Sequence, residues 1–90
     1  MNPDLLKIYS ERVLELIDRS PPSNRDAAFF RVNEFLQRAL RDASQGEVDS
    51  PRNDDGVTRW MMEYSNREDM ALLDAVASFL ILLRGWELPS

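Results

Sequence analysis

The sequence predicts an all-α protein, a small helical bundle of three long helices and one short helix. Three observations lead to this fold class. Apolar residues recur at steps of three and four, residues that cap helices precede these periodic segments, and proline or glycine separates them. The 90 residues fit a single domain.

The first helix is expected over residues 3–19. Asn2 is suited to the N-cap, Pro3 to the first helical position, and Asp4 to the positive end of the helix dipole. The apolar stripe consists of Leu6, Tyr9, Val13 and Leu16, widened by Leu5, Ile8, Leu14 and Ile17. The helix should end before Pro21 and Pro22, because a residue that precedes proline is disfavoured in the helical region.

The second helix is expected over residues 24–44, with Gly46 as its stop. Its polar face carries Arg31, Glu34, Arg38 and Arg41. We interpret this face as solvated rather than as a ridge for nucleic acid, because Glu34 interrupts the bases and no aromatic residue lies among them.

An acidic loop is expected over residues 45–56. It holds almost nothing to bury and is longer than most connections, which predicts a mobile or binding loop. A calcium loop with Gly56 at its sixth position would place Pro51 and Met62 where oxygen ligands are needed, so that reading is excluded.

The short helix is expected over residues 57–64, with Asp54 or Asp55 as its cap. A break should follow at Ser65 and Asn66, because Ser65 and Glu68 have capping-box spacing. The last helix is then expected over 66–84. Gly85 suits a left-handed C′ position, from which Trp86 folds back towards Ile81.

The run from Ala75 to Leu83 is apolar except for Ser78. It is too short for a membrane span, which takes about 20 residues, and Asp74 precedes it. Such a helix is either central, enclosed by the other helices, or shared across a two-fold axis. We favour a homodimer, because a small domain gains most from extra burial. The expected dimer interface consists of Ser78, Ile81, Leu82 and Trp86.

Composition argues against an enzyme. The chain has neither cysteine nor histidine, so its serines have no imidazole to activate them, and thiolate and imidazole metal sites are excluded. Glu11 and Glu15 lack the Glu-x-x-His partners of a bundle dimetal site, and no glycine-rich phosphate loop is present. We therefore expect no cofactor and no metal. The first residues lack the pattern of a secretory signal, which predicts a cytoplasmic protein.

The net charge of −5 lies entirely in the second half of the chain, which disfavours phosphate backbones and favours basic partners. We expect a protein–protein interaction or regulatory module. The candidate partner-binding residues are Asp49, Asp54, Asp55, Trp60, Met61, Met62 and Tyr64. We also expect that reversing the three aspartates to lysine leaves folding intact.

Three alternatives stay open. The aromatic residues of this set could simply be core residues of the short helix. The protein could be an acidic inhibitor or immunity-type protein that occupies a basic surface of its target. It could also be a helical DNA-binding regulator that uses the bases of the second helix.

Overall fold

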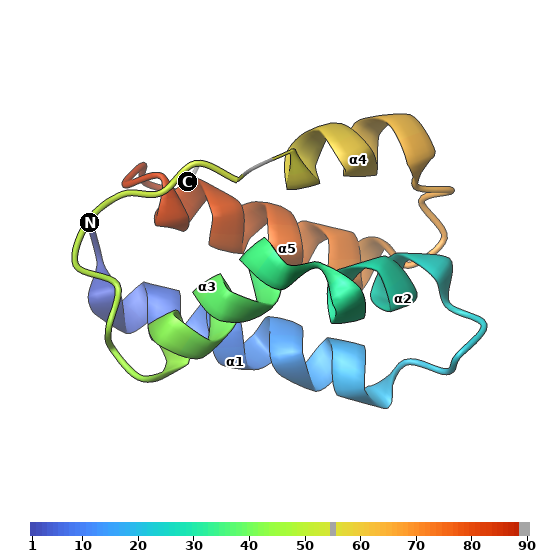
Figure 1. Cartoon of the computed structure of the whole chain (residues 1–90), viewed down its shortest axis with the longest axis horizontal. Helices are drawn as coiled ribbons and strands as arrows, with labels where there is room; N and C mark the ends of the chain where they lie inside the picture. The colour runs from blue at the N-terminus through green and yellow to red at the C-terminus, as the bar shows by residue number, and fades with distance from the viewer. Residues whose placement is uncertain (55, 89–90) are drawn as a thin grey trace.

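The computed structural model describes residues 1–54 and 56–88. The part of the chain that it describes contains five α-helices and no strand, which confirms the all-α class (Figure 1). The helices are α1 (Pro3–Arg19), α2 (Arg25–Val32), α3 (Glu34–Ser44), α4 (Val57–Tyr64) and α5 (Met70–Leu83). The expected set of three long helices and one short helix is therefore not what is observed.

Three helices form the body of the bundle. α1 packs along both α3 and α5, while α2 contacts α1 and α3. α4 lies on the other side of α5, so that α5 runs between α4 and α1 (Figure 1). The core holds fully buried side chains from every helix; the largest of them are Phe30, Phe79, Leu6, Leu36, Leu40, Leu72, Leu80, Leu82 and Leu83.

The expected helix over 24–44 is wrong, because Asn33 divides it. Asn33 ends α2, where its N–H donates to the Phe29 carbonyl at 3.1 Å, and it begins α3, where its side-chain oxygen accepts from Leu36 N at 2.9 Å. Asparagine favours such a cap over a helix interior. The break leaves α2 and α3 pointing in different directions (Figure 1).

Two polar side chains satisfy the carbonyls that helix ends leave free. Gln37 donates to the Phe30 carbonyl at 2.8 Å, across the break. Arg31 donates to the carbonyls of Ile17 and Ser20, at 2.7 and 3.1 Å, and so closes the end of α1. Arg31 is exposed, as a solvated face requires, and it also ties α2 to α1 through these two bonds.

The last helix begins later than the sequence suggested. The break after Tyr64 is confirmed, but α5 starts at Met70, where the Asp69 side chain accepts from Leu72 N at 3.1 Å. The capping box is wrong, because Ser65 Oγ accepts from Arg67 N at 3.0 Å in a tight turn. Residues 65–69 therefore form a non-helical link.

The end of α5 is as the sequence predicts. Gly85 adopts a left-handed φ of 84°, its N–H donates to the Leu82 carbonyl at 3.0 Å, and Trp86 N donates to the Ile81 carbonyl at 3.2 Å. Most α5 side chains are buried within the single chain. Among the described residues, no helix has both the length and the apolar content that crossing a bilayer requires.

The loop over 45–56 is anchored to the bundle at several points. Val48 is buried, so the expectation that the loop has almost nothing to bury is wrong. Arg52 N donates to the Leu83 carbonyl at 2.9 Å, and its guanidinium pairs with Asp42 at 3.0 Å. These contacts fasten the described part of the loop to the ends of α3 and α5. Its mobility stays a prediction.

Candidate functional site

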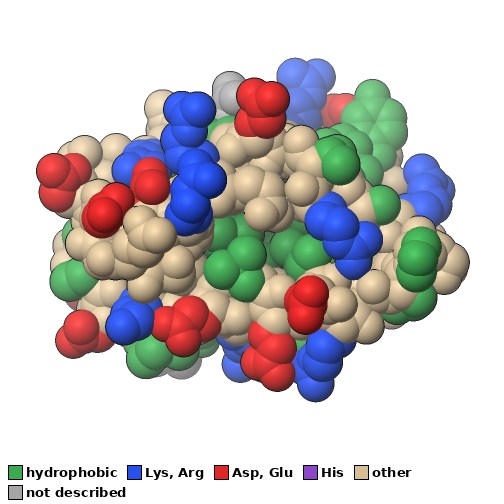
Figure 2. Space-filling model, turned by 60° about the horizontal axis from the view of Figure 1, so that its bottom comes forward, with side chains coloured by type: hydrophobic (Ala, Val, Ile, Leu, Met, Phe, Trp, Pro, Cys, Tyr) green, Lys and Arg blue, Asp and Glu red, His purple; other side chains and the backbone are tan. Residues whose placement is uncertain are grey.

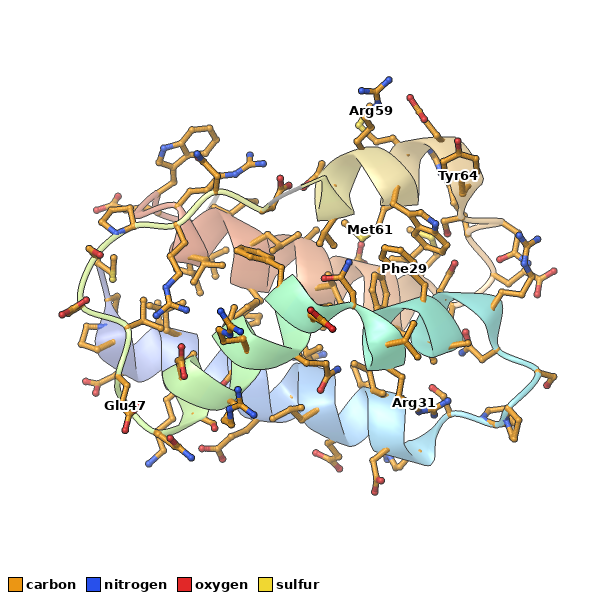
Figure 3. All side chains as sticks on the ribbon, viewed as in Figure 1. Phe29, Arg31, Glu47, Arg59, Met61 and Tyr64 are labelled. Carbon is orange, nitrogen blue, oxygen red and sulfur yellow. The ribbon has the colours of Figure 1, made fainter. Side chains whose placement is uncertain are left out.

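The candidate site is the surface of α4, defined by Trp60, Met61, Met62 and Tyr64. Helical spacing turns Val57 into the core, where it is fully buried, and leaves Trp60 and Met61 half-buried above α2 and α5. In Figure 3 Met61 lies between α4 and the bundle, whereas Arg59 points away from it. α4 is therefore an ordinary amphipathic helix, one side of which packs against the bundle.

An aromatic stack fixes the docked side. The rings of Trp60 and Phe29 lie 3.8 Å apart between centroids and only 6° from parallel. Phe30 meets the Trp60 ring edge-on, at 6.0 Å and 67°. Such ring pairs add about 0.5–1.5 kcal/mol each beyond the area that they bury. Because Phe29 lies on α2, the stack locks α4 to an element far from it in sequence.

Two large side chains of the α4 surface are exposed to solvent. Met62 is 69% exposed and Tyr64 is 60% exposed. The Tyr64 ring lies 6.4 Å from that of Trp60, so it extends the aromatic stack outwards from the bundle (Figure 3). Arg59 and Glu63 form an ion pair at 3.0 Å on the outer side of the helix. The interpretation of the aromatic residues as core residues of the short helix thus fails for Tyr64, whereas Trp60 is half-buried.

Asp54 fastens the start of α4. Its carboxylate accepts from Gly56 N at 3.2 Å and from Thr58 N at 3.1 Å, and Arg84 Nη2 lies 2.6 Å from it. The N-cap residue of α4 is Gly56 and not Asp54, although the Asp54 side chain reaches the first turn of the helix from two residues before the cap; Asp55 lies outside the described residues. Gly56 takes a left-handed φ of 88°, which a side chain would strain.

These contacts change the ionisation of Asp54. Burial of its carboxyl raises the pKa, whereas the hydrogen bonds from Thr58 and Gly56 and the charge of Arg84 lower it by more. The net effect holds the pKa below the ordinary value of 3.8. Since Asp54 is only 8% exposed, its charge serves the fold, and reversing it to lysine should destabilise the protein.

A second carboxylate fastens the end of α4, and sequence reasoning missed it. Ser65 Oγ donates to Asp26 Oδ2 at 2.8 Å, and Asp26 is 2% exposed. The other oxygen, Oδ1, is buried with no hydrogen-bond partner among the described residues. Nearby, Asn24 donates to Asp69 at 3.0 Å. The start of α2 is therefore joined to the 65–69 link by polar contacts that no sequence spacing reveals.

The four residues of the expected dimer interface differ in their solvent exposure. Leu82 is buried within the chain, Ser78 and Ile81 are half-buried, and Trp86 is 61% exposed. A dimer was expected because the sequence indicated no cover for one apolar side of the last helix. In the structure the chain itself covers most of that side. Self-association stays a prediction that now depends on Trp86 and on the partly exposed Ile81.

The remaining candidates lie elsewhere. Asp49 is exposed on the loop over 45–56, and Glu11 and Glu15 are exposed on α1. On the face shown in Figure 2, acidic and basic side chains alternate around the rim, and hydrophobic side chains show at the centre. That face therefore carries no patch of a single charge.

No protein-family model matches the chain, and comparisons with curated proteins and with solved structures gave no match. The functional argument therefore depends on the residues and contacts described above.

Proposed function

We propose that this protein is a non-enzymatic protein-interaction module and that the α4 surface is its principal contact. The observation that carries the proposal is the exposure of Met62 and Tyr64 on a helix whose opposite side is locked by the Trp60–Phe29 stack. A recognition element of this kind presents large apolar side chains without having to fold on binding.

The residue types support this use. Tyrosine, tryptophan and methionine are enriched in protein interfaces. The two aromatic residues bury a large area for few lost rotamers, and the flexible methionine side chain adapts its shape to a partner. The α4 surface holds all three within five consecutive residues, Trp60 to Tyr64. The Arg59–Glu63 pair beside it supplies a polar rim, the usual surround of an apolar contact.

The second candidate function is an acidic inhibitor that covers a basic surface of its target. The exposed acids Glu47 and Asp49 favour it, because the nearby base Arg52 is already paired with Asp42. Salt separates the two functions. A contact made by the α4 surface should lose little affinity between low and high ionic strength, whereas an acidic inhibitor should weaken steeply.

The test compares two exposed apolar positions on α4 with one on α1. Met62→Glu and Tyr64→Ser change the α4 surface, while Ile8→Glu makes a matched change at a position that is 59% exposed on α1. All three variants should keep the wild-type free energy of unfolding within about 0.5 kcal/mol. In an affinity pull-down, the expected partners are the proteins that bind wild type and Ile8→Glu but do not bind the two α4 variants.

Calorimetry with such a purified partner then measures the effect. We expect the affinity to fall by at least about tenfold for Met62→Glu and for Tyr64→Ser, as for residues at the centre of an interface. A partner that binds all three variants equally well, or that is lost equally with Ile8→Glu, would place the contact outside α4.

A further inference from the structure

The sulfur atoms of this protein all belong to methionine. The chain holds four methionines and no cysteine. Because no thiolate competes for oxidants, the methionine thioethers are the sulfur groups open to oxidation. Met1, Met62 and Met70 are exposed, and Met62 has the largest exposed fraction, 69%. Met62 is also the exposed methionine that belongs to the α4 surface.

Met61 and Met62 are adjacent in sequence but have opposite surroundings. One step along an α-helix turns the side chain by about 100°. Met61 is half-buried and packs against the hydrophobic core, between α4 and the bundle (Figure 3). The next step leaves Met62 in solvent. An oxidant therefore reaches the Met62 side chain in the closed fold, whereas it reaches Met61 freely only when α4 opens.

We propose that Met62 is an oxidation site and that its sulfoxide switches off the α4 surface. This inference rests on the proposed function, because the switch acts on that contact. The oxidant is hydrogen peroxide or another hydroperoxide.

The reaction needs no other reagent. The thioether sulfur of Met62 gives an electron pair to one oxygen of the hydroperoxide, so an S–O bond forms and the O–O bond breaks. The sulfur is oxidised to a sulfoxide, and the hydroperoxide is reduced. Its departing oxygen takes up the proton of the transferred oxygen and leaves as water or as an alcohol.

The sulfoxide changes the contact rather than the fold. In the free protein Met62 is exposed, so water solvates the new oxygen. In a complex the same oxygen is buried against the partner, and a buried polar group without a hydrogen bond weakens binding. Oxidation of Met61 acts differently, because an oxygen between α4 and the bundle loosens α4 itself. Methionine sulfoxide reductases reverse the reaction, which makes the switch at Met62 reversible.

The oxidation site is tested without a partner. The protein is treated with dilute hydrogen peroxide, catalase stops the reaction, and mass spectrometry follows the gain of one oxygen atom in each tryptic peptide. Met61 and Met62 fall in one peptide, residues 60–67, and fragment ions separate them. We expect Met62 to be oxidised at least about fivefold faster than Met61, because susceptibility follows exposure. The two rates should become similar in urea, and circular dichroism should show an unchanged helix content once Met62 is oxidised.

The switch is tested by calorimetry with a purified partner that the α4 variants fail to bind. The affinity of each protein after peroxide is divided by its own affinity before, so the effect of a substitution alone cancels. We expect at least about tenfold weakening for wild type and for Met70→Leu, which removes an exposed methionine outside α4. Met62→Leu has no sulfur at this position and should lose less than about twofold. Reductase treatment should restore the affinity of oxidised wild type.

Three results would overturn the proposal: equal oxidation rates for Met61 and Met62 in the folded protein, an oxidised wild type that binds its partner as before, or a peroxide sensitivity of Met62→Leu equal to that of wild type. Failure of the proposed function looks different. In that case Met62→Glu and Tyr64→Ser keep every partner before peroxide is added, while the oxidation rates of Met61 and Met62 still decide the modification site.

Discussion

α4 and α5 are neighbours in sequence and in space, yet they use their apolar residues differently. α5 buries eight side chains, from Leu72 to Leu83, whereas Val57 is the buried side chain of α4. α4 is held instead by ring stacking on Phe29 and by carboxylates at its two ends. The more apolar helix thus supplies most of the core contacts, and the less apolar helix leaves Met62 and Tyr64 exposed to solvent.

This difference has an energetic meaning. Removing a helix that is buried on most sides exposes the whole core, whereas releasing a helix held by a stack and two carboxylates exposes only its own contact area. The comparison therefore predicts large costs for substitutions in α5 and modest, local costs for substitutions that loosen α4.

The largest effect is expected from Phe79→Ala in α5. Phe79 is fully buried, so the variant leaves a cavity and should lose about 3–5 kcal/mol of unfolding free energy. Urea unfolding followed by circular dichroism measures this loss. Met62→Ala is the matched control in α4 and should stay within about 0.5 kcal/mol of wild type. A loss below about 1 kcal/mol for Phe79→Ala would contradict the central place given to α5.

A smaller effect is expected from Trp60→Ala. The ring is half-buried and stacked on Phe29, so its removal should cost about 2 kcal/mol, less than a fully buried tryptophan. Amide exchange should quicken through α4 and stay unchanged through α5. Phe29→Leu, which keeps apolar volume but removes the stacking, should cost about 1 kcal/mol. Equal acceleration in both helices would mean that α4 is part of the core.

An effect no larger than that of Trp60→Ala, about 1–2 kcal/mol at pH 7, is expected from Asp54→Asn, because Asn keeps the shape but loses the charge that faces Arg84. The pH dependence has a definite sign. Since the folded-state pKa of Asp54 lies below 3.8, its stabilisation is complete above that value and is lost as pH falls through the folded-state pKa.

Urea unfolding of wild type and Asp54→Asn across pH 7 to about pH 2 checks this sign. The difference between the two proteins should shrink on acidification. A difference that stays constant over that range would show that the charge of Asp54 contributes nothing.

Much of the fold could be predicted from the sequence. Strong local signals placed α1, α4 and the left-handed turn at Gly85, because caps, prolines and glycines act over a few residues. Asn33 was overlooked although asparagine is a good N-cap, since the apolar period continues across it. The start of α5 was misplaced because Ser65 binds Asp26, a partner that is 39 residues away.

The candidate site was harder to predict. The sequence selected Trp60, Met61, Met62 and Tyr64, but which of them face water depends on where α2 places Phe29. Asp54 was expected to cap α4 and to meet a partner; the N-cap is Gly56, and Asp54 is a buried side chain that accepts from the first turn of α4. Long-range contacts decide both questions, and neither periodicity nor composition contains them.

Native-state hydrogen exchange in low urea is the most direct test of the central claim, that α5 holds the fold while α4 is a separately attached recognition helix. We predict that the amides from Leu73 to Leu83 exchange only through global unfolding, with the full urea dependence. The amides of Trp60 to Tyr64 should exchange through a local opening, at least about tenfold faster and with little urea dependence. Exchange of α4 and α5 with the same free energy and the same urea dependence would contradict the claim.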